Sequence, residues 1–196
     1  MNDVINEKVL TQSKRSFTVE EYLRLERKDG SKHEFYQGKV LSKSGSGRRH
    51  NLICSNMTIA IGSRVVRQRN EVYVNDMRVR LNSKNFCYPD LIVAGAGPKF
   101  DPVEIDVLLN PTVIIEVLSP ATSMRDKTEK LEGYLAMESV RECLLVKENE
   151  LKVEQYSKQT IKQWLYKIYD GREDIVSLDA INCKISMSEI YSQITF

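Results

Sequence analysis

Two short stretches of the sequence, residues 91–93 and 113–117, consist almost entirely of Leu, Ile and Val, with no alternation between apolar and polar positions. A strand with one face in water alternates, whereas a strand covered on both faces reads as a continuous apolar run. Both stretches are far shorter than the roughly 20 residues that a membrane-spanning helix requires. They therefore predict two central strands of a sheet that other elements cover on both faces.

A carboxylate accompanies each of these stretches. Asp90 follows Tyr88 and Pro89 immediately before the first stretch, and Glu116 lies inside the second. An unpaired buried charge is strongly destabilising, so each carboxylate needs a partner. One solution is a divalent cation shared by both carboxylates. The other is that an Arg, a Lys or backbone donors satisfy each carboxylate separately, and the residues alone leave both interpretations open.

The composition restricts which metal such a site would hold. The chain has two histidines, and its four cysteines are widely separated with no CxxC pair. Neither a zinc site nor a redox motif is expected, and the cysteines are expected to be reduced. Carboxylate oxygens prefer hard ions, so Mg²⁺ or Mn²⁺ is the expected cofactor if metal binds.

A helix is predicted from residue 124 to residue 138, shortly after the second apolar stretch. Asp126, Lys130 and Tyr134 recur in it at four-residue steps, which places neighbours about 40° apart on one helix face. These side chains can point together at the strand ends, and Lys130 is better placed than Lys127 to approach Glu116. The alternative is a surface ion pair between Asp126 and Lys130.

The remaining pattern predicts a single domain, residues 17–196, preceded by a flexible polar arm over residues 1–16. Apolar spacing and capping signals predict further helices at 18–27 and from residue 50 for about five turns. A short terminal helix is expected at 186–190. Turn signals and apolar runs predict a hairpin around Gly38, a strand within 72–81, and strands at 143–146, 151–156 and 164–169. The predicted fold class is α/β, with helices flanking a central mixed β-sheet.

The net charge excludes general coating of nucleic acid. Twenty-nine Lys and Arg residues against 27 Asp and Glu residues give +2, so any nucleic-acid contact has to be a local patch. One candidate is Arg48, Arg49 and His50 at the predicted start of the long helix, where backbone donors favour phosphate. The alternative is a solvated helix end with a basic flank. Arg78 and Arg80 are expected on a solvated strand face.

The first 16 residues and the hydropathy of the whole chain indicate the cellular location of the protein. Residues 1–16 mix acidic and basic side chains and contain no long apolar run, so they do not resemble a secretory signal. No stretch is long and apolar enough to span a membrane. These observations predict a cytoplasmic protein with no membrane partner.

Five motifs follow one another along the chain: FTVEEY at 17–22, HEFYQG at 33–38, YPDL at 88–91, IEVLSP at 115–120 and DKTEKL at 126–131. Their order and spacing resemble the Uma2 family, whose members are similar to restriction endonucleases of the PD-(D/E)XK superfamily. The resemblance covers about residues 17–157. It implies a restriction-endonuclease-like fold, in which a mixed sheet flanked by helices holds the metal site.

The resemblance also implies roles for particular residues. Asp90 and Glu116 would ligate Mg²⁺ or Mn²⁺, and Glu34 would hold a metal-bound water or a second ion. Magnesium suits this set because it takes oxygen ligands, keeps several waters and needs few protein carboxylates. For Glu34 the alternative is a hairpin carboxylate paired with Lys32 or Lys39.

One position departs from the superfamily pattern. The superfamily has a Lys two residues after the Glu on the same strand, but Leu118 occupies that position here. The resemblance implies that Lys130, from the following helix, supplies the missing ammonium group. Such a charge can position the attacking water and stabilise the transition state. Asp126 and Tyr134 would support the site.

The function that follows is an endonuclease that depends on Mg²⁺ and hydrolyses phosphodiester bonds in DNA. A homodimer is expected by analogy, because two related sites can cut two strands. The alternative is a non-catalytic nucleic-acid-binding or protein-interaction module that retains the nuclease fold. The missing strand lysine and the nearly neutral net charge favour this alternative.

Overall fold

The larger sheet of the protein contains both apolar stretches. In the computed structural model, which describes residues 16–29, 32–43, 46–95, 97–119 and 126–196, this sheet has the order β11-β10-β9-β8-β6-β3. The strands are β3 (Glu71–Val74), β6 (Leu91–Ala94), β8 (Val113–Leu118), β9 (Glu142–Lys147), β10 (Val153–Thr160) and β11 (Gln163–Tyr169). β8 and β9 are parallel and the other neighbours are antiparallel, so the sheet is mixed. Every residue of β6 and β8 is buried, which confirms the two predicted central strands.

A second sheet has five strands in the order β2-β1-β5-β4-β7. These are β1 (His33–Tyr36), β2 (Lys39–Ser42), β4 (Arg78–Asn82), β5 (Asn85–Cys87) and β7 (Val107–Leu108). β1 and β2 form the hairpin predicted around Gly38, and its turn residues Gln37 and Gly38 have φ angles of 46° and 85°. Positive φ at both positions is the signature of a two-residue hairpin turn. Glycine is favoured at position 38, because its φ of 85° is one that residues with a Cβ rarely adopt.

The chain passes between the two sheets as a bent hairpin. β3 is followed by β4, and β5 is followed by β6. In each of these two arms, one strand (β3 or β6) belongs to the six-stranded sheet and the other (β4 or β5) to the five-stranded sheet. One bend is at Asn75, which has a φ of 59°, and the other is at Pro89 and Asp90; the Asn75 N–H donates to the Asp90 carbonyl at 2.9 Å. The prediction of one strand within 72–81 is wrong, because the left-handed Asn75 ends the pairing in the larger sheet. The bend places Asp90 where the two sheets meet.

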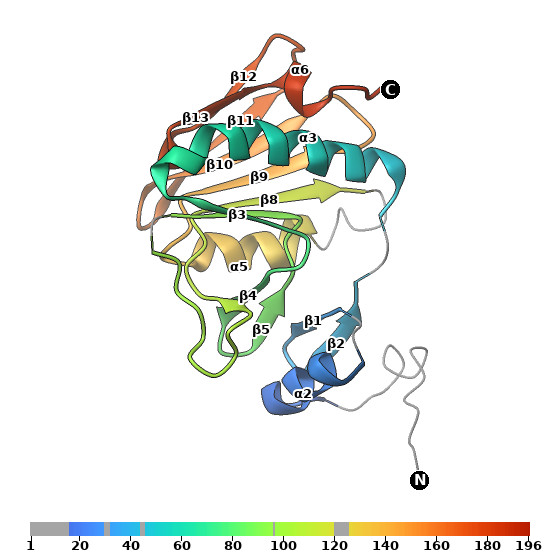
Figure 1. Cartoon of the computed structure of the whole chain (residues 1–196), viewed down its shortest axis with the longest axis vertical. Coiled ribbons are helices and arrows are strands. Elements are labelled where there is room, and N and C mark those ends of the chain that lie inside the picture. The colour runs from blue at the N-terminus through green and yellow to red at the C-terminus, as the bar shows by residue number, and fades with distance from the viewer. Residues whose placement is uncertain (1–15, 30–31, 44–45, 96, 120–125) are drawn as a thin grey trace.

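Helices lie on both faces of the six-stranded sheet (Figure 1). The helical segments are α2 (Val19–Asp29), α3 (Arg48–Val65), η1 (Val66–Gln68), the π-helix η2 (Asp126–Lys130), α5 (Leu131–Ala136), η3 (Asp179–Ile181) and α6 (Met187–Ile190). α3 covers one face together with α6 and the hairpin of β12 (Ile175–Leu178) and β13 (Cys183–Ser186). α5 covers the other face, on the connection from β8 to β9. The predicted mixed sheet with flanking helices is confirmed.

The core is divided by the six-stranded sheet into two layers. Side chains at alternate positions, such as Leu91 and Ile115, pack with Ile53 of α3. The intervening side chains, such as Ile114, pack with Tyr134 of α5. A third cluster joins α2 to the five-stranded sheet. Because both faces of β6 and β8 pack against apolar side chains, polar groups on these strands can meet water only near the strand ends.

Several other expectations can be compared with the described residues. The helices predicted at 18–27 and from residue 50 are α2 and α3, and the strands predicted at 143–146, 151–156 and 164–169 are β9, β10 and β11. The described part of the helix predicted over 124–138 begins at residue 126, and the arm predicted over 1–16 lies outside the described residues except for Ser16. Arg78 is buried, so its prediction on a solvated face is wrong. No helix in the described ranges combines the length and apolar character needed to cross a membrane.

Candidate active site

Asp90 lies at the bend that enters the six-stranded sheet, and its carboxylate is buried. Its Oδ2 accepts the N–H of Val117 at 2.9 Å and lies 3.0 Å from Nε2 of His50 on α3. Its Oδ1 lies 3.3 Å from Nζ of Lys43, which follows β2. The bond from Val117 ties Asp90 directly to the neighbouring strand, beside Glu116.

Glu116 lies on β8 and faces α5. The antiparallel register of β6 and β8, continued by one residue, places Asp90 opposite Glu116. Glu116 Oε1 accepts the Tyr134 hydroxyl at 2.5 Å and lies 3.2 Å from Lys130 Nζ. The predicted four-residue step from Lys130 to Tyr134 therefore brings both side chains to one carboxylate oxygen.

Lys130 connects Glu116 to Glu34, which belongs to the other sheet. Its Nζ lies 2.7 Å from Glu34 Oε1, and the Lys130 side chain is 8% exposed, against 5% for Glu34 and 2% for Glu116. This burial excludes the alternative of a surface ion pair for Lys130. Glu34 has Lys130 as a partner, whereas Lys32 pairs with Asp76. The π-helical turn that ends at Lys130 is a feature that occurs frequently at functional sites.

The surroundings of Asp90 favour its ionised form. Burial raises the pKa of the carboxyl group. The hydrogen bond from His50, the positive charge of Lys43 and the Val117 N–H outweigh burial and lower the pKa to about 2. Asp90 is therefore a carboxylate over the whole neutral range.

Burial keeps the nearby thiol and phenol groups protonated. Cys54 Sγ lies 3.6 Å from Nδ1 of His50, and Nε2 of the same ring lies beside Asp90. The three side chains therefore form a continuous chain of contacts. Burial and then the charge of Asp90 raise the Cys54 pKa to about 12, so this thiol is not an activated nucleophile. Burial also raises the pKa of Tyr134 well above its ordinary value, so its hydroxyl remains a hydrogen-bond donor.

Two residues of the site differ from the sequence-based expectation. His50, expected at a nucleic-acid surface with Arg48 and Arg49, is buried against Asp90, whereas both arginines are exposed. Lys43 had no predicted role. The one sequence signal for it is its position directly after the hairpin that carries Glu34. Asp126 belongs to η2, and its side chain lies outside the described residues.

The side chains that meet here fit a hard divalent cation by their chemistry. Glu34, Asp90 and Glu116 supply carboxylate oxygens, which Mg²⁺ and Mn²⁺ prefer, and Asp90 is ionised as a ligand must be. Among the described residues, no three His, Cys, Asp or Glu side chains are grouped closely enough to hold an ion. The ammonium groups of Lys43 and Lys130 lie beside the carboxylates instead. An ion that uses Asp90 would therefore meet Lys43 at Oδ1.

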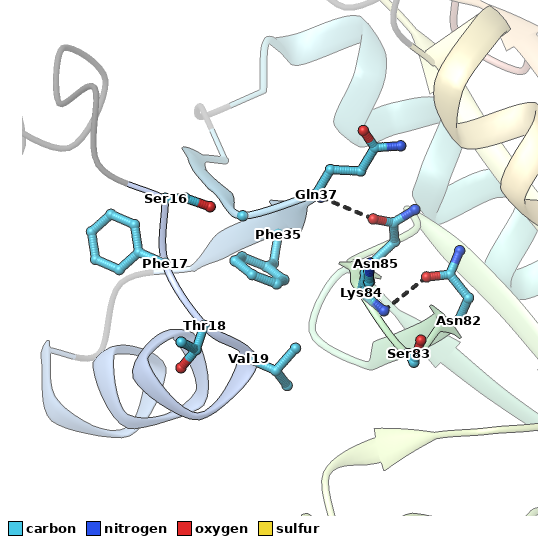
Figure 2. A pocket seen from close by; sticks show the side chains of 11 residues that line it. Ser16, Phe17, Thr18, Val19, Phe35, Gln37, Asn82, Ser83, Lys84 and Asn85 are labelled. Atoms are coloured by element: carbon cyan, nitrogen blue, oxygen red, sulfur yellow. Dashed lines mark hydrogen bonds between the residues drawn. The ribbon is translucent and has the colours of Figure 1, made fainter.

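A separate hollow of about 950 Å³ lies at the turn end of the β1–β2 hairpin (Figure 2). Phe17, Phe35 and Asn85 are among the residues that line it, and the N–H of Gln37 donates to Asn85 Oδ1 at 3.0 Å. Lys84 is the one charged residue in its described lining, and no predicted site residue belongs to that lining. The hollow is therefore distinct from the carboxylate site.

The comparison with protein families decides the family of the chain. Residues 19–188 match the Uma2 model, which is described as "Putative restriction endonuclease". The chain belongs to the Uma2 family. The resemblance carried by the five motifs is confirmed, and the coarse functional class is that of restriction-endonuclease-like nucleases.

Individual relatives are consistent with this membership. Two are from Synechocystis sp. (strain ATCC 27184 / PCC 6803 / Kazusa). "Uncharacterized protein sll1609" is 32% identical over 149 residues, which is 76% of this chain and 84% of the relative. "Uncharacterized protein slr1290" is 25% identical over 178 residues, which is 90% of this chain and 92% of the relative. A crystal structure of "a putative nuclease belonging to DUF820" from Anabaena variabilis superposes with a TM-score of 0.74 at 20% identity. The superposition covers 90% of this chain and 98% of the Anabaena protein, so the two proteins share a fold.

Proposed function

We propose that this Uma2 protein is a nuclease that depends on a divalent metal, Mg²⁺ or Mn²⁺, and hydrolyses phosphodiester bonds in DNA. The observation that carries the proposal is that Asp90 and Glu116 lie opposite each other on neighbouring buried strands, while Lys130 joins Glu116 to Glu34. A bound divalent ion supplies Lewis acidity and positive charge at a phosphate. The three carboxylates exceed the two neighbouring lysines by one formal negative charge, so the buried site favours an added cation.

Each residue has a proposed task in this reaction. Asp90 and Glu116 hold the ion, and Tyr134 fixes Glu116 through its hydroxyl. Lys130 orients the attacking water and adds positive charge for the phosphate, because its Nζ lies 3.2 Å from Glu116. Glu34 keeps Lys130 in that position from the other sheet. We also propose that Asp126 supports the site.

The exposed start of α3 is the proposed contact for the DNA backbone. Arg48 and Arg49 lie in its first turn, which contains no acidic residue. The free N–H groups and the dipole of a helix N-terminus favour phosphate. His50, in the same turn, reaches Asp90, so a phosphate at this helix end lies near the carboxylates.

The assembly and location proposed for the protein follow from the reaction. Two copies of the chain would present two related sites to the two strands of DNA, so we propose a homodimer. Sedimentation velocity tests this directly. The described cysteines are free thiols, which suits the reducing cytoplasm that we propose as the location.

Metal binding can be tested before a substrate is known. Calorimetric titration with Mn²⁺ should show binding by the wild-type protein and its loss in Asp90→Asn and Glu116→Gln. Glu150→Gln, in an exposed turn far along the chain, is the matched control and should bind as the wild type does. Circular dichroism shows whether each variant is folded.

Nuclease activity is then tested on supercoiled plasmid DNA with Mg²⁺. Nicking by the wild type and by Glu150→Gln, and its loss in Asp90→Asn, Glu116→Gln and Lys130→Met, is the expected result. Equal Mn²⁺ binding in all variants would reject the metal assignment. Absence of binding by the wild type, even with DNA present, would instead favour a binding module that retains the fold.

A further inference from the structure

The two oxygens of Asp90 have different partners. Oδ2 accepts the Val117 N–H at 2.9 Å and lies 3.0 Å from His50 Nε2, which accounts for both lone-pair directions of that oxygen. Oδ1 faces the ammonium group of Lys43 at 3.3 Å. A cation that takes Asp90 as a ligand therefore competes with Lys43 and leaves the contact with His50 in place.

The two ammonium groups of the site are held very differently. Lys130 contacts both Glu34 and Glu116, and its side chain is 8% exposed. Lys43 contacts one oxygen of Asp90 and the carbonyl of Tyr88, at 2.8 Å, and its side chain is 21% exposed. Moving Lys130 would leave two buried carboxylates without this cation. Moving Lys43 vacates one oxygen that a metal ion can occupy, so Lys43 is the ammonium group able to leave.

The formal charge of the site points to where Lys43 goes. Glu34, Asp90 and Glu116 together with Lys43 and Lys130 carry a formal net charge of −1. A divalent ion changes this to +1, and in a buried site such an excess favours the approach of an anion. One negative phosphate group of a nucleic acid restores neutrality without the loss of either lysine from the site.

We propose that Lys43 is a phosphate-binding residue of this site. It neutralises Asp90 while the ion is absent, and it contacts a phosphate oxygen of DNA once Asp90 Oδ1 holds the ion. The inference rests on the proposed nuclease function and deepens it, because it names a lysine outside the five family motifs as a substrate contact. Lys43 is partly exposed and follows the last residue of β2, so its side chain can move without refolding of the strand.

The first measurement is Mn²⁺ affinity without nucleic acid. Lys43→Met removes the competing charge, and Lys43→Gln removes the charge but keeps a donor for the Tyr88 carbonyl. Both should bind Mn²⁺ about two- to fivefold more tightly than the wild type, the range expected for loss of one partly exposed ion pair. Lys39→Met removes an equal charge from an exposed position of β2 and should leave the affinity unchanged. Thermal unfolding verifies that each variant is folded.

The second measurement is DNA affinity in the presence of Ca²⁺, by fluorescence anisotropy of a short labelled duplex of mixed sequence. Lys43→Met should bind about three- to tenfold more weakly, with a salt dependence reduced by about one phosphate contact. Lys39→Met should behave as the wild type.

The outcomes separate this inference from the proposed function. If the wild type binds Mn²⁺ but neither Lys43→Met nor Lys43→Gln binds it more tightly than the wild type, the inference is overturned and the nuclease proposal stands. Tighter Mn²⁺ binding with unchanged DNA affinity also overturns the phosphate-binding role. If the wild type binds no Mn²⁺, both proposals are rejected.

Discussion

A buried network of charged and phenolic side chains lies directly behind the bend that carries Asp90. Arg78 Nε donates to the Tyr88 hydroxyl at 2.8 Å, and this hydroxyl donates to Glu26 Oε2 at 2.5 Å. Glu26 also lies 3.3 Å from the Arg78 guanidinium group and 2.8 Å from His33 Nδ1. The network therefore joins α2, β1 and β4 to the residue two positions before Asp90.

We predict that Arg78→Met destabilises the protein by about 3–5 kcal/mol, because it leaves Glu26 buried with its main cation removed. Adding Glu26→Gln should recover part of this loss, since the two residues are coupled. Urea unfolding followed by tryptophan fluorescence measures both effects. Arg24→Met, on an exposed position of α2, is the control. A loss for Arg78→Met no larger than that of the control would show that the network does not stabilise the bend.

The sequence identifies some residues of the site better than others. Asp90, Glu116 and Lys130 can be found because a carboxylate beside a continuous apolar run is unusual and a four-residue step defines a helix face. The contacts of Glu116 bring Lys130 and Tyr134 to it, and Asp90 lies opposite Glu116 in the strand register. Lys43 and His50 reach Asp90 from other parts of the chain. No local pattern encodes such contacts, because they depend on how the elements pack.

The helix α6 shows how a local sequence signal links two elements. Ser186 and Glu189 form a reciprocal capping box, in which each side chain accepts the backbone N–H of the other. Glu189 Oε1 also lies 2.6 Å from the guanidinium group of Arg64 on α3. The N–H of Ser186 and then Arg64 lower the pKa of the Glu189 carboxyl group. One carboxylate thus caps α6 and attaches it to α3.

We predict that Glu189→Gln lowers stability near neutral pH and that the difference disappears in acid. A carboxyl group whose pKa is lower in the folded state stabilises the fold above its unfolded value of 4.5, and this contribution is lost as the pH falls below it. Chemical unfolding over a range of pH measures the difference. Glu173→Gln, at an exposed position, should have no such dependence. A stability difference that persists unchanged in acid would show that the charge of Glu189 has no part in the effect.

Element boundaries were predictable where one periodicity ran without interruption. The central strands and α3 are of this kind, and the short helix expected at 186–190 is α6. The bend at Asn75 was missed because the apolar residues on either side of it look like one strand, although they belong to different sheets. The hairpin of β12 and β13 was missed as well. Apolar residues alternate with polar ones in both strands, as at Val176, Ser177 and Leu178, and this alternation is the sequence signal for the hairpin.

At the scale of the whole molecule, the larger sheet ends in an exposed edge. β11 pairs with β10, and it has no second neighbour among the described strands. Leu165, Tyr166 and Ile168 of β11 are 42%, 46% and 48% exposed. A long edge strand that exposes apolar side chains is a template for pairing between chains, and proteins commonly protect such an edge with a lysine. Lys167 is the one charged residue of β11.

We predict that Lys167→Val leaves the free energy of unfolding within about 1 kcal/mol of the wild type, because the side chain is exposed. The same change should promote aggregation, since it makes the edge strand entirely uncharged. Light scattering during incubation at increasing protein concentration measures this. Lys162→Val, in the turn between β10 and β11, removes the same charge away from the ladder of the edge. Faster aggregation of Lys167→Val alone would assign the protection to the edge, whereas equal aggregation of the two variants would assign it to net charge. Soluble Lys167→Val would mean that the exposed edge is protected by something other than its lysine.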